Sequence, residues 1–330
     1  MKKSILGVVV VVALIGGVWL MTKEIKPTDQ KIKIGALLPL TGKFANLGED
    51  IKNGLELARR DSKEGKGIDF EIVYEDSAAD PKVALAATQK LITIDKVQFV
   101  YGGPGSSANI AVAPIFEQNK VIFTAISSTP KLNDMCGYIF KVQPDIDGEV
   151  SRIAQRMFAE GFRKVGLIFD SASDTQTTGA NLFRDHFEKQ GGKVVATEGY
   201  DSKTITDFRT ILTKLKGQKS DALFFLAIEK IAGTAVKQAR EIGLTEQIYG
   251  WSPFESEEFF KVAGALADGV IITGMPFSCE GTVLMKQYCQ HYATAYSGRI
   301  PLQYSAHAYD VFFILADTVK ANKKGLFDLD

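Results

Sequence analysis

Residues 98–118, QFVYGGPGSSANIAVAPIFEQ, form the strand–turn–helix unit on which the fold prediction rests. An apolar run ends in a glycine-rich turn, and Ser106 and Ser107 then open a stretch with the apolar spacing of a helix. The free N–H groups and the dipole at a helix N-terminus favour an anion, and serine hydroxyls add donors there. The alternative is that one serine only caps the helix. The turn lacks G-x-G-x-x-G, so it gives little support to a dinucleotide site.

The same alternation of apolar runs and helical stretches extends over most of the chain. Strands are expected at 31–38, 70–76, 98–103, 121–125, 164–170, 193–200, 222–227, 247–252 and 269–274. Helical spacing is found at 48–62, 81–95, 106–119, 147–160, 178–190, 231–242, 255–264 and 282–320. Continuous apolar strands separated by helices indicate parallel sheets that are covered on both faces.

The alternation runs through two cycles, which predicts two lobes. The expected fold class is α/β, with two doubly wound parallel-sheet lobes joined by hinge strands. Lobe 1 comprises 31–143 plus 275–330, and lobe 2 comprises 144–274. A ligand cleft is expected at the carboxyl ends of both sheets.

Residues 1–30 differ from the rest. Lys2 and Lys3 precede an uncharged apolar stretch, 4–22, and a short polar linker follows. This pattern is typical of a secretory signal or a membrane anchor, and we favour an uncleaved anchor because no cleavage signal is obvious. The remainder of the chain is then expected outside the cytoplasm. A buried core helix is the alternative reading of this stretch.

Composition excludes several classes of protein. Lysine plus arginine equals aspartate plus glutamate, 39 each, so the basic excess that would bind nucleic acid is absent. The cysteines, Cys136, Cys279 and Cys289, are too few for a disulfide scaffold. One pair could form in an oxidising compartment, and Cys279 with Cys289 is the nearer pair in sequence.

Three strand ends of lobe 1 carry candidate ligand-binding residues. Ser106 and Ser107 follow one strand, and Ser127 and Ser128 follow the next, so backbone and hydroxyl donors would converge on one small polar ligand such as a carboxylate. The alternative is a serine-rich loop without a ligand. Glycines in the loop 37–50 would let Phe44 and Leu47 form an apolar wall.

The loops of lobe 2 supply a second group of candidates: Asp174, Thr178, Glu229, Trp251 and Ser252. Trp251 fits packing on a ligand and plain core equally well.

Catalytic motifs are absent from the sequence. There is no G-x-S-x-G, P-loop, H-E-x-x-H or C-x-x-C, and no nucleophile stands with a base. We therefore predict neither an enzyme nor a catalytic residue, and no cofactor or metal.

Several segments together resemble a known family. KIKIGALLPLTGKFANLGEDIKNGLELA is similar to the opening of the extracytoplasmic leucine/isoleucine/valine-binding proteins of ABC transporters, which have the type I periplasmic binding fold. YEDSAADPKVALAATQKLI, GGPGSSAN, ISSTPKL, KVGLIFD, DALFFLA, AVKQAREIGL and GVIITG follow in the family's order. The resemblance implies a non-enzymatic, monomeric binding protein. It would close two lobes on an amino acid or a related small molecule and deliver it to an ABC permease in the membrane. A sensing receptor with the same fold is the alternative function.

The resemblance also implies roles for lobe 1 residues. Ser106 matches the serine that holds the ligand carboxylate. Ile126 matches a backbone contributor to amino-group binding, and Ser128 stands in place of a threonine that binds near the ammonium and carboxylate.

The chain departs from the family pattern at three ligand positions. Ser252 stands near the family glutamate that pairs with the ligand ammonium, Thr178 replaces a tyrosine, and Leu47 replaces an aromatic residue. Either Glu229 or Asp174 supplies the missing carboxylate, or the ligand is not an α-amino acid but an amide, urea or an aromatic acid. Family members also continue beyond the point that corresponds to 320, so we expect the natural chain to extend past Asp330.

Overall fold

The computed structural model describes residues 32–135, 137–274 and 277–322. Its first sheet has the strand order β2-β1-β3-β4-β5. The pairs β1–β3, β3–β4 and β4–β5 are parallel. The strands are β1 (Ile32–Leu38), β2 (Phe70–Asp76), β3 (Phe99–Gly102), β4 (Ile122–Ala125) and β5 (Ile139–Lys141). The helical elements between them are η1 (Gly42–Phe44), α2 (Ala45–Lys66), α3 (Pro81–Thr93), α4 (Ser106–Gln118) and η2 (Pro130–Leu132).

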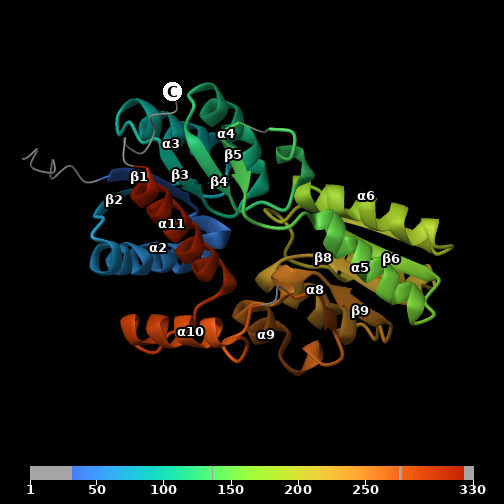
Figure 1. Ribbon diagram of the computed structural model, residues 1–330. Coiled ribbons are helices and arrows are strands. Elements are labelled where there is room, and N and C mark those ends of the chain that lie inside the picture. The colour runs from blue at the N-terminus through green and yellow to red at the C-terminus, as the bar shows by residue number, and fades with distance from the viewer. Residues whose placement is uncertain (1–31, 136, 275–276, 323–330) are drawn as a thin grey trace, which may run out of the picture. The chain divides into compact units, whose positions relative to one another are not determined.

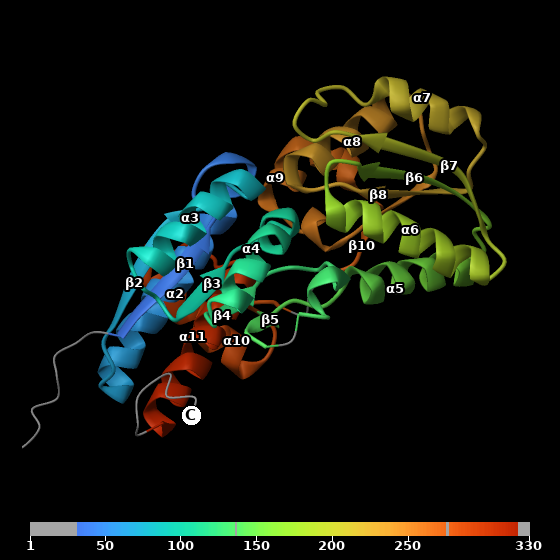
Figure 2. The ribbon, with the colours of Figure 1, turned by 90° about the horizontal axis from the view of Figure 1, so that it is seen from above.

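The second sheet repeats this plan with the strand order β10-β9-β8-β6-β7 and parallel pairing throughout. The strands are β6 (Lys164–Asp170), β7 (Lys193–Tyr200), β8 (Ala222–Leu226), β9 (Gln247–Gly250) and β10 (Ile271–Ile272). The helical elements are α5 (Ile146–Ala159), α6 (Asp174–Lys189), α7 (Arg209–Gly217), α8 (Glu229–Glu241), η3 (Ser252–Phe254), α9 (Glu257–Ala263) and η4 (Gly264–Ala267). Figure 2 shows α5 and α6 on one face of this sheet and α7 and α8 on the other.

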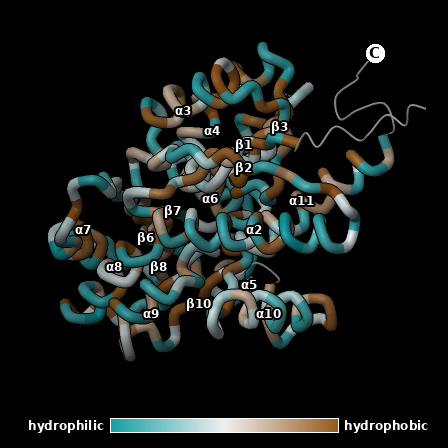
Figure 3. Tube along the Cα trace, turned by 90° about the vertical axis from the view of Figure 1, so that its left-hand side faces the viewer, coloured by the Kyte–Doolittle hydropathy of each residue, from teal (hydrophilic) through white to brown (hydrophobic). Residues whose placement is uncertain are grey.

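Burial explains why the strands carry continuous apolar runs. All five residues of β8 are fully buried, because the sheet is covered on both faces. Figure 3 shows the central strands β1 and β3 in largely apolar colours, whereas much of α2 is hydrophilic. The α/β class and the two parallel-sheet lobes predicted from the sequence are confirmed.

Two C-terminal helices, α10 (Val283–Ala295) and α11 (Gln303–Ala321), complete the described chain. Helix α11 packs along α2, as Figure 1 shows. Gly54 lies where the two backbones meet, since a Cβ there would stand 2.3 Å from the carbonyl oxygen of Ser305. Buried Asp50 of α2 links both C-terminal helices by accepting hydrogen bonds from the Tyr292 hydroxyl of α10 at 2.9 Å and the Ser305 amide of α11 at 3.1 Å. Burial raises the pKa of Asp50 to about 6, although these hydrogen bonds oppose the shift.

Several boundaries differ from the sequence prediction. The stretch 282–320 is two helices rather than one, because Gly298 adopts a φ of +84° and Pro301 removes a donor before α11. Helix α7 was not predicted, and the segment 138–145, which we expect to leave one lobe for the other as a strand, contributes β5 to the first sheet. The expected N-terminal anchor at 1–30 lies outside the described residues. Within the described ranges, none of the helices combines the length and apolar composition needed to span a bilayer.

A disulfide joins Cys279 to Cys289, with the two Cα atoms 5.6 Å apart. It ties the segment before α10 to the helix itself. We expect the Cys279→Ser/Cys289→Ser double variant to lose about 3 kcal/mol of unfolding free energy, because the closed loop no longer restricts the unfolded chain. Urea denaturation with and without reductant measures this. The unfolding free energy of the wild type should fall by the same amount on reduction, and that of the double variant should not change. A wild type that is equally stable with and without reductant would contradict the prediction.

Candidate functional site

A cavity of about 1390 Å³ lies at the carboxyl ends of both sheets. Loops that follow β1, β3, β4, β6, β8 and β9 contribute to its lining. In the first sheet β1 has β2 on one side and β3 on the other, and in the second sheet β6 stands between β7 and β8. Chain connections reverse direction at such points, which leaves a crevice outside the strand ends.

Most of the sequence candidates line this cavity. They are Phe44, Leu47, Ser106, Ser107, Ile126, Ser127, Ser128, Glu229, Trp251 and Ser252. Asp174 and Thr178 are absent from the lining. Whether the lining residues contact a ligand stays a prediction.

The first-sheet side of the cavity offers hydrogen-bond donors. Ser106 is the first residue of α4, and the N-cap is Gly105, which has no side chain, so the terminal N–H groups receive no cap from it. The Ser127 hydroxyl donates to the Ser106 hydroxyl oxygen at 2.9 Å. The serines therefore surround the helix end rather than occupy its N-cap, and the arrangement suits an anion.

Asn109 holds the two serine-bearing loops together. The residue is 4% exposed, and its side-chain amide donates to the carbonyl oxygens of Gly103 and Ile126, each at 3.0 Å. The Gly103 carbonyl belongs to the loop after β3, and the Ile126 carbonyl to the loop after β4. One buried side chain thus fixes the spacing between Ser106 and Ser127.

A third loop of the first sheet presents Phe44 and Leu47. Asp76 shapes this loop by accepting hydrogen bonds from the Leu40 amide at 2.9 Å and the Thr41 hydroxyl at 2.6 Å. Gly48 is required where α2 begins, since a Cβ there would stand 2.1 Å from the Pro39 carbonyl oxygen.

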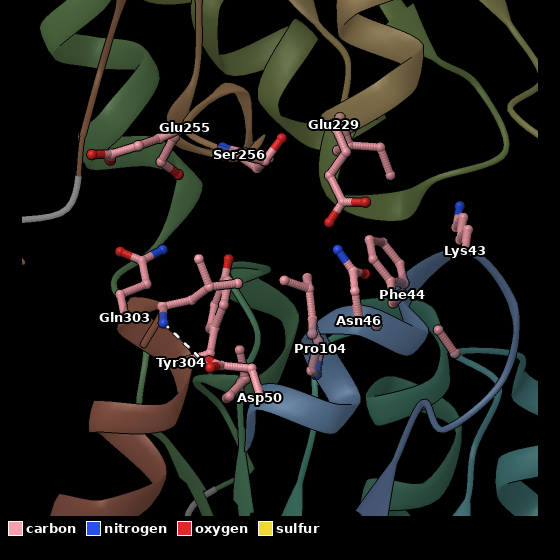
Figure 4. A pocket seen from close by; sticks show the side chains of 18 of the residues that line it. Lys43, Phe44, Asn46, Asp50, Pro104, Glu229, Glu255, Ser256, Gln303 and Tyr304 are labelled. Atoms are coloured by element: carbon pink, nitrogen blue, oxygen red, sulfur yellow. Dashed lines mark hydrogen bonds between the residues drawn. The ribbon is translucent and has the colours of Figure 1, made fainter. Parts of the chain in front are cut away.

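Glu229 stands on the opposite side of the cavity, at the start of α8. The residue is 9% exposed, and its Oε1 has no hydrogen-bond partner within the described residues. Figure 4 shows its carboxylate extending from its own side of the cavity towards Asn46 on the other. Burial, reinforced by the charge of Glu258 and opposed by that of Lys43, raises the pKa of Glu229 to about 7.

The backbone of Glu229 is also strained. Its φ is +42°, a backbone conformation that residues other than glycine rarely adopt and that costs about 1–3 kcal/mol. A buried, unpaired carboxyl on a strained backbone is unfavourable for folding on both counts. These features are typical of a residue that is retained for binding.

Trp251 and Ser252 line the cavity but also serve the interior. Trp251 is 5% exposed, packs in the core of the second lobe, and donates its indole N–H to the Ala227 carbonyl oxygen. The hydroxyl of Ser252 donates to Glu149 at 3.2 Å. The backbone amide of Ser252 and the hydroxyl of Thr273 also donate to this carboxylate. Burial raises the pKa of Glu149.

Asp174 and Thr178 are placed differently from the expectation because α6 begins at Asp174 instead of near 178. Both residues therefore belong to a helix rather than to a loop. Asp174 accepts a hydrogen bond from the Thr129 hydroxyl at 3.0 Å and pairs with Lys131. Its neighbours Thr175 and Gln176 line the cavity in its place.

The structure adds lining residues that the sequence reasoning missed. Lys43 and Asn46 lie close to the expected Phe44 and Leu47, and Glu255 lies after β9, close to the expected Trp251 and Ser252. Gln303 and Tyr304 come from the N-terminus of α11. They follow no strand, and only Pro301 marked a helix start in their vicinity. Among the described residues, no group of three or more histidine, cysteine, aspartate or glutamate side chains is placed to hold a metal ion.

Comparisons with known proteins find relatives that cover most of the chain. A family model described as periplasmic binding protein matches residues 31–327. The Leu/Ile/Val-binding protein homolog 2 of Brucella abortus (strain 2308) is 27% identical over 251 residues, which are 74% of this chain and 67% of that protein.

Solved structures show the same fold. One is the branched-chain amino acid transporter substrate binding protein LivJ from Streptococcus pneumoniae in complex with isoleucine. Its TM-score is 0.81 with 28% identity, over 89% of this chain and 85% of that one. A solute binding protein from R. palustris in complex with benzoate has a TM-score of 0.79 with 22% identity, over 88% and 81%. At that identity the likeness shows the fold alone.

Proposed function

Because the chain belongs to the periplasmic binding protein family, we propose that it captures an α-amino acid for an ABC transporter. Members of this family bind solutes outside the cytoplasm and are not enzymes. The similar proteins from Brucella abortus and Streptococcus pneumoniae are described as binding leucine, isoleucine or valine and as a branched-chain amino acid transporter component. Delivery of the ligand to a membrane permease is part of this proposal.

The charge arrangement of the cavity supports an amino acid. The uncapped N-terminus of α4, with Ser106, Ser127 and Ser128, would hold the α-carboxylate. Glu229 would pair with the α-ammonium, because its buried oxygen has no partner within the described residues. Asp174 is the weaker alternative, since its carboxylate already pairs with Lys131 outside the cavity lining. The unpaired Glu229 is the single observation that carries the proposal.

The volume of the cavity supports a closing motion. At about 1390 Å³ it exceeds the roughly 300–1,000 Å³ of a typical small-molecule pocket. We propose that the lobes, 31–143 with 275–330 and 144–274, close on the ligand about the connecting segments. Such closure is driven only by the tighter binding of the ligand in the closed state.

Thermal unfolding with a ligand panel tests this function. L-amino acids at about 100 times their dissociation constant should add about 2.7 kcal/mol of stability. Leucinamide lacks the carboxylate and 4-methylpentanoate lacks the ammonium, so both should give much smaller shifts than leucine. A shift with benzoate or 4-methylpentanoate as large as that with any amino acid would contradict the ammonium site.

A pair of variants tests whether the α-carboxylate of the ligand binds at Ser106. Ser106→Ala should weaken amino acid binding about tenfold, since it removes a hydroxyl that would donate to a charged oxygen. Ser151→Ala on α5, outside the cavity lining, is the matched control and should bind like the wild type. Equal affinities for the two variants would place the carboxylate elsewhere.

A further inference from the structure

The charges that line the cavity are unevenly paired. Among the described residues, two of its three cationic side chains pair with carboxylates: Lys203 lies 3.8 Å from Asp80, and Arg299 lies 2.6 Å from Glu49. The third, Lys43, donates to the neutral hydroxyl of Ser202 and acts on Glu229 only from beyond ion-pair range. These pairs also use two of the lining carboxylates, and Asp50 is held by its hydrogen-bond donors.

Four lining carboxylates remain on the second-sheet side, and we call them the acidic wall: Glu229, Glu255, Glu257 and Glu258. Within the described residues, no cation lies in ion-pair range of Glu229, Glu255 or Glu257. Glu258 has only Lys261 at 3.8 Å, a pair at an exposed site that contributes little. Glu255 and Glu257 are exposed and Glu258 is half-buried. Partial burial raises the pKa of Glu255.

One observation separates the acidic wall from an ordinary solvated cluster. Glu229 is more than nine-tenths buried, its Oε1 is unpaired within the described residues, and its carboxylate extends into the cavity (Figure 4). A carboxyl in that position calls for a cation from the ligand.

The rest of the wall continues beyond Glu229. Figure 4 places Glu255 and Ser256 on the same side of the cavity as Glu229, with Gln303 and Tyr304 of α11 across from them. An amide oxygen, a phenol oxygen and an aromatic face all favour a cation over an alkyl chain. A branched aliphatic side chain placed there would desolvate these polar groups without pairing them.

We propose that the ligand is a cationic amino acid, in which one carboxylate and the α-ammonium are joined by a second ammonium or a guanidinium that docks against Glu255 and Glu258. The inference rests on the proposed function, because it assigns the α-ammonium to Glu229. A single ammonium balances that one carboxylate and leaves the remainder of the acidic wall without a counter-charge.

Isothermal titration with matched ligand pairs tests the second cation. L-arginine and L-citrulline have nearly the same shape and differ in charge, and so do L-lysine and L-norleucine. The cationic member of each pair should bind about tenfold more tightly or better. The preference should shrink as salt is raised, because partly exposed pairs are screened.

Variants identify the residues responsible. Glu255→Gln with Glu258→Gln should reduce the preference for arginine over citrulline towards unity, while binding of citrulline changes little. Glu64→Gln, an exposed position on α2 outside the cavity lining, should keep the wild-type preference. A double variant with the wild-type preference would overturn the assignment to these residues, and the wild-type preference itself tests the proposal if the double variant does not fold.

The outcomes separate this proposal from the proposed function. If norleucine and citrulline bind as tightly as lysine and arginine, the second cation is overturned while the amino acid site stands. If leucine, norleucine, lysine and arginine all fail to bind the folded protein, the amino acid function and this inference are overturned together.

Discussion

Glu229→Gln is expected to make the ligand-free protein more stable and, at the same time, to weaken amino acid binding about hundredfold or more. Removing one partner of a buried ion pair costs about 3–5 kcal/mol, and tenfold in affinity corresponds to about 1.4 kcal/mol. Without ligand the same change removes a desolvated charge that has no partner within the described residues. Stability and binding should therefore move in opposite directions.

The raised pKa of Glu229 makes the free energy of unfolding depend on pH. The carboxyl of Glu229 ionises near its ordinary value of 4.5 in the unfolded chain and near pH 7 in the folded protein. Between these values the folded state holds more protons than the unfolded state, so stability falls as pH rises from about 4.5 through 7. The contribution that is lost amounts to about 3 kcal/mol. In the glutamine variant this fall should disappear.

Urea denaturation from pH 5 to pH 8, with and without amino acid, measures both effects. Ligand binding should release protons near pH 7, because the ammonium displaces the proton of Glu229. Titrations in buffers with different ionisation enthalpies would detect that release. Glu64→Gln serves as the control, with wild-type stability and affinity. A glutamine variant that keeps the full pH dependence would show that another group causes it.

Asn109→Asp is expected to produce the largest loss of stability, about 3–5 kcal/mol at neutral pH. The substitution replaces two donated hydrogen bonds by a buried carboxylate that faces the carbonyl oxygens of Gly103 and Ile126. Both loops would move apart, so the anion site between Ser106 and Ser127 should weaken as well. Protonation would restore one donor, and stability should therefore recover on acidification.

A surface asparagine provides the control for this variant. Asn119 also donates its side-chain amide to a carbonyl oxygen, that of Ile115 at 2.8 Å, but at an exposed position. Asn119→Asp should cost less than about 1 kcal/mol, since water can solvate the groups that lose their partner. Chemical denaturation of both variants between pH 4 and pH 8 makes the comparison. Similar losses in the two would refute a bridging role for Asn109.

The strands were predictable from their runs of apolar and β-branched residues, which in β6 are buried on both faces and in the edge strands β2 and β7 are mostly half-buried. Residues 70–76, 164–170 and 193–200 were expected as strands and are strands with the same bounds. The unpredicted α7 is short, and a nine-residue helix gives a weak periodic signal. The break before α11 depends on the φ of Gly298 and on Pro301, which the long apolar pattern obscured.

The cavity lining was predictable where it follows strands, as at Ser106 and Glu229. It was not predictable at Gln303 and Tyr304, because their position depends on the packing of α11 against a helix about 240 residues earlier in the chain. Nor could the sequence show that Glu229 is unpaired or strained. Those properties arise from its burial and backbone angle, which neighbours distant in sequence determine.

The packing of α11 on α2 has a consequence for the order in which the chain folds. The second sheet and its helices are contiguous from Ile146 to Ile272, so they can assemble as soon as that stretch has been synthesised. The apolar face of α2 has no cover until α11 is made, which at about 5–20 residues per second takes more than ten seconds. High contact order of this kind slows folding. The first lobe can therefore complete its structure only after α11 has been made, later than the second sheet and its helices.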